Sequence, residues 1–436
     1  MKKLLIISPF FPPASTPDLQ RVRMSLPHYK KFGWEPVVLT VDSSDQSVLQ
    51  EPDLLQTIPS DIRIEKVKPF SYRKLNFFGI RNIGLRAWLP LWRRGCELLE
   101  QEKFDAIFFS TTQFFVLPLG PLWKRRYNVP YIIDIQDPWL TNYYYQKGVS
   151  KPPGGWKYHI TYLTAWLLEG WTYRHAAGFM SVSARYFQEL QSRYSWFKEK
   201  IQTTIRFGAS KEDQKYSLQL VPTQDRLPQF ENNILRIVYT GAAGPIMPKA
   251  LNAFFDGVQH YRESHPEKAA RFRFLFLGTS YAPPDKALPS VVPIAKEWKM
   301  DDLVLEVPSR LGFLECLRYQ AEADALLMLG SSDLAYSPSK LYTYFLSGPP
   351  ILAPVFKNSV LEEMLQELNC ARLIHIGEEG SRDVSRQEIA QFLNDALAGF
   401  TPCALPQRRD DLFAKKYLAE SLTADQCCLF DAALQI

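Results

Sequence analysis

Short, continuously apolar runs alternate along the chain with longer segments in which apolar residues recur at helical spacing. Such a run is typical of a strand buried on both faces of a parallel sheet, and the longer segments predict the helices that cover it. The predicted strands are Lys3–Ser8, Glu35–Val41, Phe104–Ser110, Val129–Ile135, Ala177–Ser183, Leu235–Thr240, Phe272–Gly278, Val304–Pro308, Asp324–Leu329 and one that begins at Ile351. This order predicts an α/β protein with two doubly wound, Rossmann-like domains.

A polar stretch with little periodicity separates the two sets of strands, and we expect it to be an interdomain linker. The predicted parts are a first domain over residues 1–208, the linker over 209–233, a second domain over 234–410 and a C-terminal helical segment over 411–436. The predicted helices include Trp156–His175, Arg185–Tyr194, Pro248–Ser264, Gln387–Ala398, Asp411–Leu434 and one from about Asp18 to Lys31.

Composition narrows the class of protein. The 436 residues are 46% hydrophobic and 22% charged, which is typical of a globular protein of two or three domains. The net charge of +5, without a long basic run, argues against nucleic acid and is compatible with an anionic substrate or membrane surface. The six cysteines show no Cys-x-x-Cys spacing, and the first apolar run is too short for a signal peptide. We therefore expect a cytosolic protein.

One stretch, Ser337–Ala353, combines several informative residues. Ser339 is a predicted helix N-cap, and Gly348 followed by two prolines ends the helix. Lys340 falls in the first helical turn, where a positive charge opposes the helix dipole unless an anion is bound there. An ordinary solvated lysine explains the same spacing equally well.

This stretch resembles the donor-site signature of retaining nucleotide-sugar glycosyltransferases of family 4. These enzymes have the GT-B fold, in which the last helix usually crosses back onto the first domain. The chain keeps that family's residues at Lys340, Tyr342, Tyr344, Gly348, Pro350, Ile351 and Leu352. It departs where the family has a glutamate that grips the donor ribose, since Thr343 stands there. The family's partner acid, eight residues earlier, is replaced by Ala335. A hydroxyl can bond a ribose more weakly than a carboxylate does.

The N-terminal half resembles the same family in two places. Leu19-Gln20-Arg21 and Gly33–Thr40 match its opening, although Ala14-Ser15-Thr16 replaces a loop that is usually rich in glycine. Asp134-Ile-Gln-Asp-Pro-Trp139 matches its Asp-x-Arg-Asp-Pro-Trp motif, with Gln136 in place of the arginine. Charged residues at the carboxyl end of a parallel strand are where α/β folds keep their chemistry.

The resemblance implies a bacterial enzyme of polysaccharide biosynthesis, which moves a sugar from a nucleotide-diphosphate sugar to a glycan or lipid-linked acceptor with retention. It implies no metal and no cofactor, since the nucleotide sugar is a substrate. The residues expected to bind the donor are Gly241, Gly244, Lys249, Gly278, Arg310, Ser339, Lys340 and Thr343. Those expected on the acceptor side or in the cleft are Ser15, Thr16, Arg21, Asp134 and Trp139. Asp137 would favour positive charge at the transferred sugar, and Lys340 would neutralise the leaving diphosphate.

Two questions stay open at this stage. Loss of both family glutamates and of the glycine loop supports an alternative function, a non-catalytic GT-B scaffold that binds a sugar or a partner enzyme. The segment 70–94 is rich in arginine, lysine and aromatic residues. It fits a basic amphipathic segment on the inner face of the plasma membrane. It also fits a helix that packs its tryptophans inward while its arginines face water.

Overall fold

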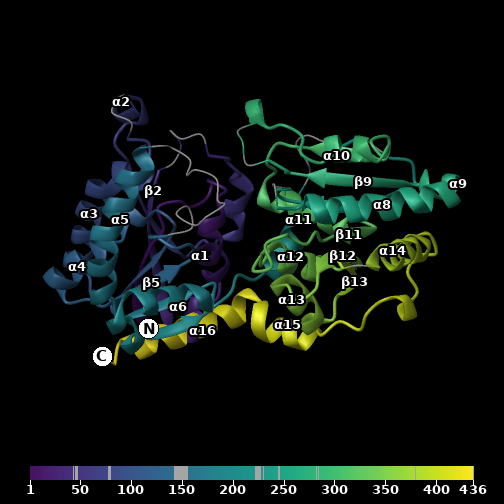
Figure 1. Cartoon of the computed structure of the whole chain (residues 1–436). Coiled ribbons are helices and arrows are strands. Elements are labelled where there is room, and N and C mark those ends of the chain that lie inside the picture. Colours follow the sequence, from purple (N-terminus) through teal and green to yellow (C-terminus); the bar gives the residue numbers. More distant parts are fainter. Residues whose placement is uncertain are drawn as a thin grey trace. The chain divides into compact units, whose positions relative to one another are not determined.

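The computed structural model describes the chain except residues 43, 45–47, 77–79, 142–155, 221–226, 229, 244–245, 281, 283, 379 and 436. It forms two compact units, Met1–Phe207 with Ala419–Ile436, and Gly208–Leu418 (Figure 1). These limits differ from the expected ones at two points. Helix α7 (Lys211–Ser217) falls within the expected linker, and helix α15 (Asp410–Tyr417) within the expected C-terminal segment, yet both belong to the second unit.

The first unit is built on seven parallel strands in the order β3-β2-β1-β4-β5-β6-β7. Their bounds are β1 Lys2–Ile7, β2 Trp34–Val41, β3 Arg63–Val67, β4 Ala106–Ser110, β5 Tyr131–Ile135, β6 Gly178–Ser181 and β7 Ile201–Thr204. The strand order reverses direction between β1 and β4, which is the point where doubly wound sheets bind ligands at their carboxyl edge.

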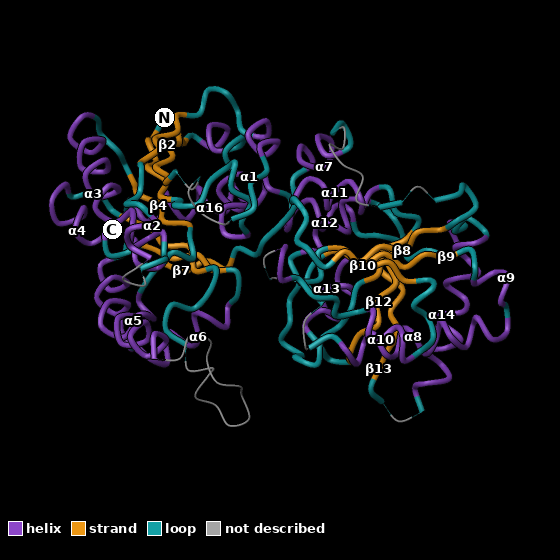
Figure 2. Tube along the Cα trace, turned by 90° about the horizontal axis from the view of Figure 1, so that it is seen from above, coloured by secondary structure: helices purple, strands orange, loops and turns teal. Residues whose placement is uncertain are grey.

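Helices cover both faces of this sheet (Figure 2). They are α1 Gln20–Ser25, α3 Ile83–Gln101, α4 Leu119–Tyr127, α5 Trp156–His175, α6 Ala184–Arg193 and α16 Ala419–Ala433. A further short helix, α2 Tyr72–Asn76, precedes α3. Alternate strand residues serve the two cores: Leu5 and Ile7 pack with α3 to α6, and Leu4 and Ile6 pack with α1 and α16. The C-terminal helix α16 thus returns to the first unit, as the resemblance implied.

The second unit repeats the arrangement with six parallel strands in the order β10-β9-β8-β11-β12-β13. The strands are β8 Leu235–Thr240, β9 Phe272–Leu277, β10 Val304–Val307, β11 Ala325–Leu327, β12 Ile351–Phe356 and β13 Ala371–Ile376. Its remaining helices are α8 Pro248–Ser264, α9 Pro266–Ala269, α10 Val292–Glu297, α11 Phe313–Ala321, α12 Lys340–Ser347, α13 Val360–Leu368 and α14 Ser381–Leu397. The order reverses between β8 and β11. The expected fold class, two doubly wound α/β halves, is therefore confirmed.

Two predicted helices are interrupted. The helix expected over Asp18–Lys31 is a short α1 between two 3-10 turns, Pro17–Leu19 and Tyr29–Phe32, because Pro27 has no N–H to continue the helical bonds. The last predicted helix breaks at Leu418, whose extended backbone pairs with Ala209. That break is what separates α15 from α16.

Candidate functional site

Lys340 lies at the carboxyl edge of the second sheet, as the first residue of α12. Its Nζ atom is 3.8 Å from the centre of the Tyr239 ring, which belongs to β8. Gly241, just after β8, has φ +99°, and a Cβ there would lie 3.2 Å from the same Nζ. The left-handed backbone and the close approach both require glycine at this position.

The ammonium of Lys340 is poorly solvated, and among the described residues no carboxylate neutralises its charge. Burial lowers the pKa of Lys340 to about 7, because the charged form loses water. Within the described part of the chain no carboxylate is paired with this ammonium. The Tyr239 ring offers only its weak negative face. A positive charge held in this way favours the binding of an anion.

One hydrogen bond joins α12 directly to β8, and one bond from α11 and one within α12 support it. The hydroxyl of Tyr344 accepts the N–H of Thr240 at 2.8 Å, and Gln320 donates to the Thr240 hydroxyl at 2.9 Å. The buried hydroxyl of Thr343 donates to the Lys340 carbonyl at 3.0 Å, so its proton is already used. The anchor residues Tyr344 and Gln320 were not predicted, since only the fold brings them to Thr240.

Ser339 stands at the predicted N-cap position of α12, but it does not cap the helix. Ser339 has a helical backbone, and its side chain makes no capping bond. The N–H groups of Leu341 and Tyr342 donate to the carbonyls of Pro338 and Ser339. These two amides are therefore not free to bind an anion at this helix start.

The other expected donor residues fall into two groups. Gly278, which follows β9, has φ +73°, and a Cβ there would lie 3.9 Å from the Gly241 nitrogen. Arg310 is exposed in the loop after β10, and its Cα would be 4.0 Å from that Cβ. The loops after β8, β9 and β10 therefore meet at one place. Lys249 is exposed in the first turn of α8, and Gly244 lies outside the described residues.

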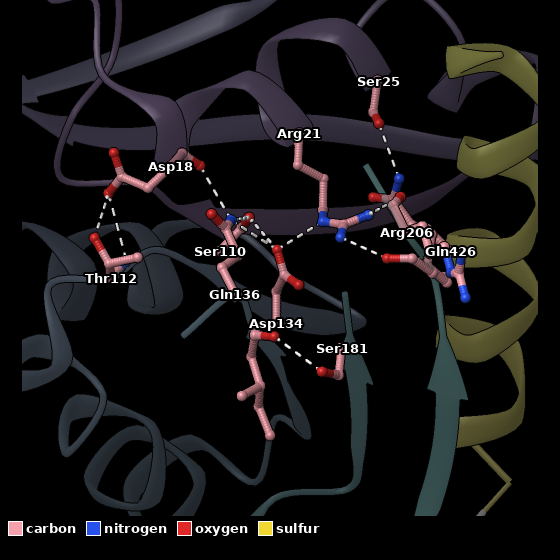
Figure 3. Close-up of polar contacts among 12 residues, drawn as sticks. Asp18, Arg21, Ser25, Ser110, Thr112, Asp134, Gln136, Ser181, Arg206 and Gln426 are labelled. Carbon is pink, nitrogen blue, oxygen red and sulfur yellow. Dashed lines mark hydrogen bonds and ion pairs between the residues drawn. The ribbon is translucent and has the colours of Figure 1, made fainter. Parts of the chain in front are cut away.

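In the first unit, Arg21 and Asp134 form a buried ion pair with Nε 2.8 Å from Oδ2 (Figure 3). The same carboxylate oxygen accepts the Ser110 hydroxyl and the Gln136 amide, each at 2.8 Å. Arg21 also donates to the Ile205 carbonyl at 2.7 Å. The two charges are thus paired inside the unit, although the buried Oδ1 atom of Asp134 accepts no hydrogen bond. The expectation that they line a cleft is corrected, since neither side chain is accessible to a ligand.

Asp18 is a carboxylate that the sequence interpretation missed. It is buried, and its oxygens accept the hydroxyls of Thr16, Thr111 and Thr112 at 2.7 to 3.3 Å. Burial raises the pKa of Asp18. The sequence around Asp18 gave no indication of these bonds, because Thr111 and Thr112 follow β4 and lie far along the chain.

Asp137 is exposed and follows β5. Its pKa is raised, first because surrounding protein displaces solvent and second because the charge of Asp18 is near. The turn that carries Asp137 is anchored at Leu140 by the ion pair of Glu169 and Arg193. Glu169 of α5 accepts the Leu140 N–H at 2.9 Å, and Arg193 of α6 donates to the Leu140 carbonyl at 2.9 Å.

Two further expected cleft residues are internal. Trp139 is buried and stacks on Phe114, with ring centres 5.8 Å apart. Ser15 is buried, and its hydroxyl donates to Glu51 at 2.9 Å. Of the residues expected on the acceptor side, Thr16 remains partly exposed, and its hydroxyl proton is engaged by Asp18. Exposed Asp137 is then the predicted residue of this edge best placed to meet a ligand.

Comparisons with known proteins agree with this architecture. Residues 20–203 match the family model of the glycosyl transferase 4-like domain. No curated protein sequence matches the chain. Similar solved structures include Anabaena HepE in complex with UDP and glucose, with TM-score 0.56, 12% identity, and 99% of this chain and 100% of that chain covered.

Two more structures are similar over almost their full lengths. Sucrose-phosphate synthase from Thermosynechococcus elongatus has TM-score 0.51 at 13% identity, with 100% of this chain and 97% of that chain covered. WaaG, a glycosyltransferase involved in lipopolysaccharide biosynthesis, has TM-score 0.51 at 13% identity, with 95% and 99% covered. At such low identity these similarities show the fold, and the chain has the two-domain GT-B fold.

Proposed function

We propose that this protein is a glycosyltransferase that uses a nucleotide-diphosphate sugar. The observation that carries the proposal is the ammonium of Lys340, desolvated, without a carboxylate partner among the described residues, and set beside Gly241 at the carboxyl edge of β8. A diphosphate supplies the missing negative charge. Support also comes from the family match of the first unit and from the GT-B neighbour HepE, which was solved with UDP, and with UDP-glucose.

In the proposed reaction the second unit binds the nucleotide sugar and the first binds the acceptor, a glycan or a lipid-linked sugar. As the bond from the anomeric carbon to the diphosphate breaks, Lys340 stabilises the charge on the leaving group, which replaces the usual metal ion. Asp137 favours the positive charge that develops on the sugar. We further propose retention of configuration and a role in making cell-surface polysaccharide, a role supported by the similarity to WaaG.

The decisive experiment exposes the purified chain to a panel of UDP-, GDP-, ADP- and dTDP-sugars and measures nucleotide release with and without EDTA. We expect one donor to be hydrolysed slowly without acceptor, at a rate that EDTA leaves unchanged. Proton NMR of the transfer product then tests retention. If no nucleoside diphosphate or nucleotide sugar binds by calorimetry, the proposal is wrong.

A second candidate, a non-catalytic sugar-binding scaffold, is favoured by one observation. The position of the family's ribose-binding glutamate holds Thr343, whose hydroxyl donates to the Lys340 carbonyl and can therefore only accept a bond from a ribose. The same panel separates the two functions. Donor binding without any release of nucleotide, in the presence of a mixed acceptor extract, would favour the scaffold.

A further inference from the structure

Helix α5 of the first unit carries an exposed apolar stripe. Ile160, Leu163, Trp166, Leu167 and Trp171 are 51%, 55%, 58%, 57% and 40% exposed. The spacings of three and four residues place them along one side of the helix. The opposite side packs into the core through Ala165 and Tyr173. From here on we call these five residues the α5 stripe.

The clustering of the α5 stripe is what requires an explanation. Fourteen large apolar side chains are exposed among the described residues, and these five belong to one helix, while the others are scattered over both units. Single exposed apolar residues are ordinary, but a contiguous group of this kind marks a surface that contacts something. From Tyr158 to Leu168 the sequence contains no Asp, Glu, Lys or Arg.

A basic cluster adjoins the C-terminal end of the stripe, where the ring of Trp171 contacts His175. Lys124 of α4 donates to the His175 carbonyl at 3.0 Å, and Lys200 donates to the Arg174 carbonyl at 2.7 Å. The pKa of Lys200 is lowered by burial and then by the charges of Lys124 and Arg174.

Two more arginines extend this cluster. Arg125 and Arg126 are exposed in the last turn of α4, which contacts α5. Glu100 pairs with Arg126, and Glu199 lies near Lys200. The cationic residues outnumber these acids, so the basic cluster keeps a positive charge.

The segment 70–94, the other candidate for a membrane contact, is largely engaged within the protein. Trp88 stacks on Trp92, and Trp92 stacks on the buried Trp123, each pair at 6.1 Å. Arg86 is buried, and Arg94 pairs with Glu65. Its tryptophans therefore pack inward, which is the second of the two interpretations left open by the sequence.

We propose that the α5 stripe and its basic cluster dock the protein on a membrane surface that carries anionic lipids. Apolar side chains enter the boundary between headgroups and acyl chains, tryptophans lie at that boundary, and lysine and arginine meet lipid phosphates. The basic residues beside the stripe favour this occupant, because lysine and arginine next to a membrane contact are attracted to anionic lipids. No helix among the described residues is both long and apolar enough to cross a bilayer. The contact is therefore interfacial, and it does not depend on the proposed sugar transfer.

The test is co-flotation of the full chain with vesicles of phosphatidylcholine, with and without phosphatidylglycerol. We expect the wild type to bind the anionic vesicles. The variant Leu163→Gln/Leu167→Gln should bind them about tenfold more weakly, because two apolar side chains are removed from the contact. Arg125→Gln/Arg174→Gln should bind about tenfold more weakly at low ionic strength, and the difference should shrink at high salt.

The matched control is Phe70→Gln/Leu85→Gln, which removes two apolar side chains that are exposed on the segment 70–94 of the same unit. This control should bind vesicles as the wild type does, and all variants should keep the wild-type melting temperature. Failure of the wild type to bind anionic vesicles, or unchanged binding of the stripe variant, would overturn the proposal. So would a wild-type dimer that the stripe variant turns into a monomer without any vesicle binding, because a second copy would then be the occupant.

Discussion

The ammonium of Lys340 lies over the face of Tyr239, 3.8 Å from the ring centre, without a carboxylate partner among the described residues. A cation over an aromatic ring recovers part of the lost hydration energy, but the ring does not neutralise the charge. The pair therefore holds the Lys340 amine at the edge of the sheet, where a bound anion would favour its protonated form. All five predictions below depend on Lys340 or on the carboxylates of the other unit.

Replacing Lys340 by alanine should weaken nucleoside diphosphate binding by about 1.5–3 kcal/mol, the range for hydrogen bonds to charged groups. Calorimetry with UDP and GDP measures the change. Lys296→Ala, an exposed lysine in the last turn of α10, is the control for a general loss of positive charge. Equal affinities for the wild type and Lys340→Ala would remove this lysine from the site.

Diphosphate binding should also depend on pH through Lys340. Its pKa is about 7 in the free protein, and a bound diphosphate raises it. Below that value the lysine is already protonated, so it adds no further pH dependence to the affinity. Above it, binding must take up a proton, so affinity falls as pH rises. Calorimetry at pH values above the free pKa, in buffers of different ionisation enthalpy, should report net proton uptake. Lys340→Arg stays charged throughout and should show a flat profile. A flat wild-type profile contradicts the assignment.

Gly241→Ala tests the close approach to Lys340. The φ of +99° should cost about 1–2 kcal/mol of stability for an alanine, and the new Cβ would displace the ammonium. Gly348→Ala is the matched control, because its φ of +102° imposes similar strain with no atom within 4 Å of the new Cβ. Melting temperatures should fall similarly in both variants, whereas diphosphate affinity should fall in Gly241→Ala alone. Loss of affinity in both would point to general destabilisation.

Asp137→Asn keeps the shape of the side chain and removes its charge. If Asp137 favours positive charge on the sugar, turnover should fall about a hundredfold or more, while folding and nucleotide affinity change little. If it merely caps a turn, the variant should lose about 1 kcal/mol of stability and keep its turnover. Asp42→Asn is a suitable control, since Asp42 is an exposed aspartate that follows β2 of the same sheet and accepts the Ser44 N–H at 3.0 Å.

Asp18→Asn should change the pH profile of turnover. The charge of Asp18 helps to raise the pKa of Asp137, so its removal should lower that pKa. Asp137 then ionises at lower pH, and the acidic limb of the turnover profile moves to lower pH. The variant should also lose some stability, because an amide has one acceptor oxygen where the carboxylate has two, so some of the hydrogen bonds from Thr16, Thr111 and Thr112 are lost. An unmoved acidic limb in a variant that folds would show that the two carboxylates act independently.

The apolar pattern was sufficient to predict the two doubly wound halves. Runs such as Leu4–Ile7 are apolar at every position, and a strand that buries both faces in a parallel sheet needs that pattern. The bounds of α8 were predicted to the residue, since Pro248 opens a long periodic segment. Strands β3, β7 and β13 were missed, because their sequences mix polar and apolar residues and each lies at or next to a sheet edge.

Within the site, the sequence placed Lys340 at a helix start and Asp137 after a strand, and the structure has both there. Local pattern fixes such positions, because caps, turns and strand ends involve neighbouring residues.

What a charged side chain contacts was decided by the tertiary structure alone. Arg21 and Asp134 are far apart in the sequence. From the sequence alone, each could have bound a ligand, whereas in the fold they bind each other. The same holds for α5, which has apolar residues on all sides. Only its packing against the rest of the unit decides which side is buried, and it leaves Leu163 and Leu167 exposed. Periodicity determines which elements form, whereas burial and pairing depend on contacts between residues that only the folded chain brings together.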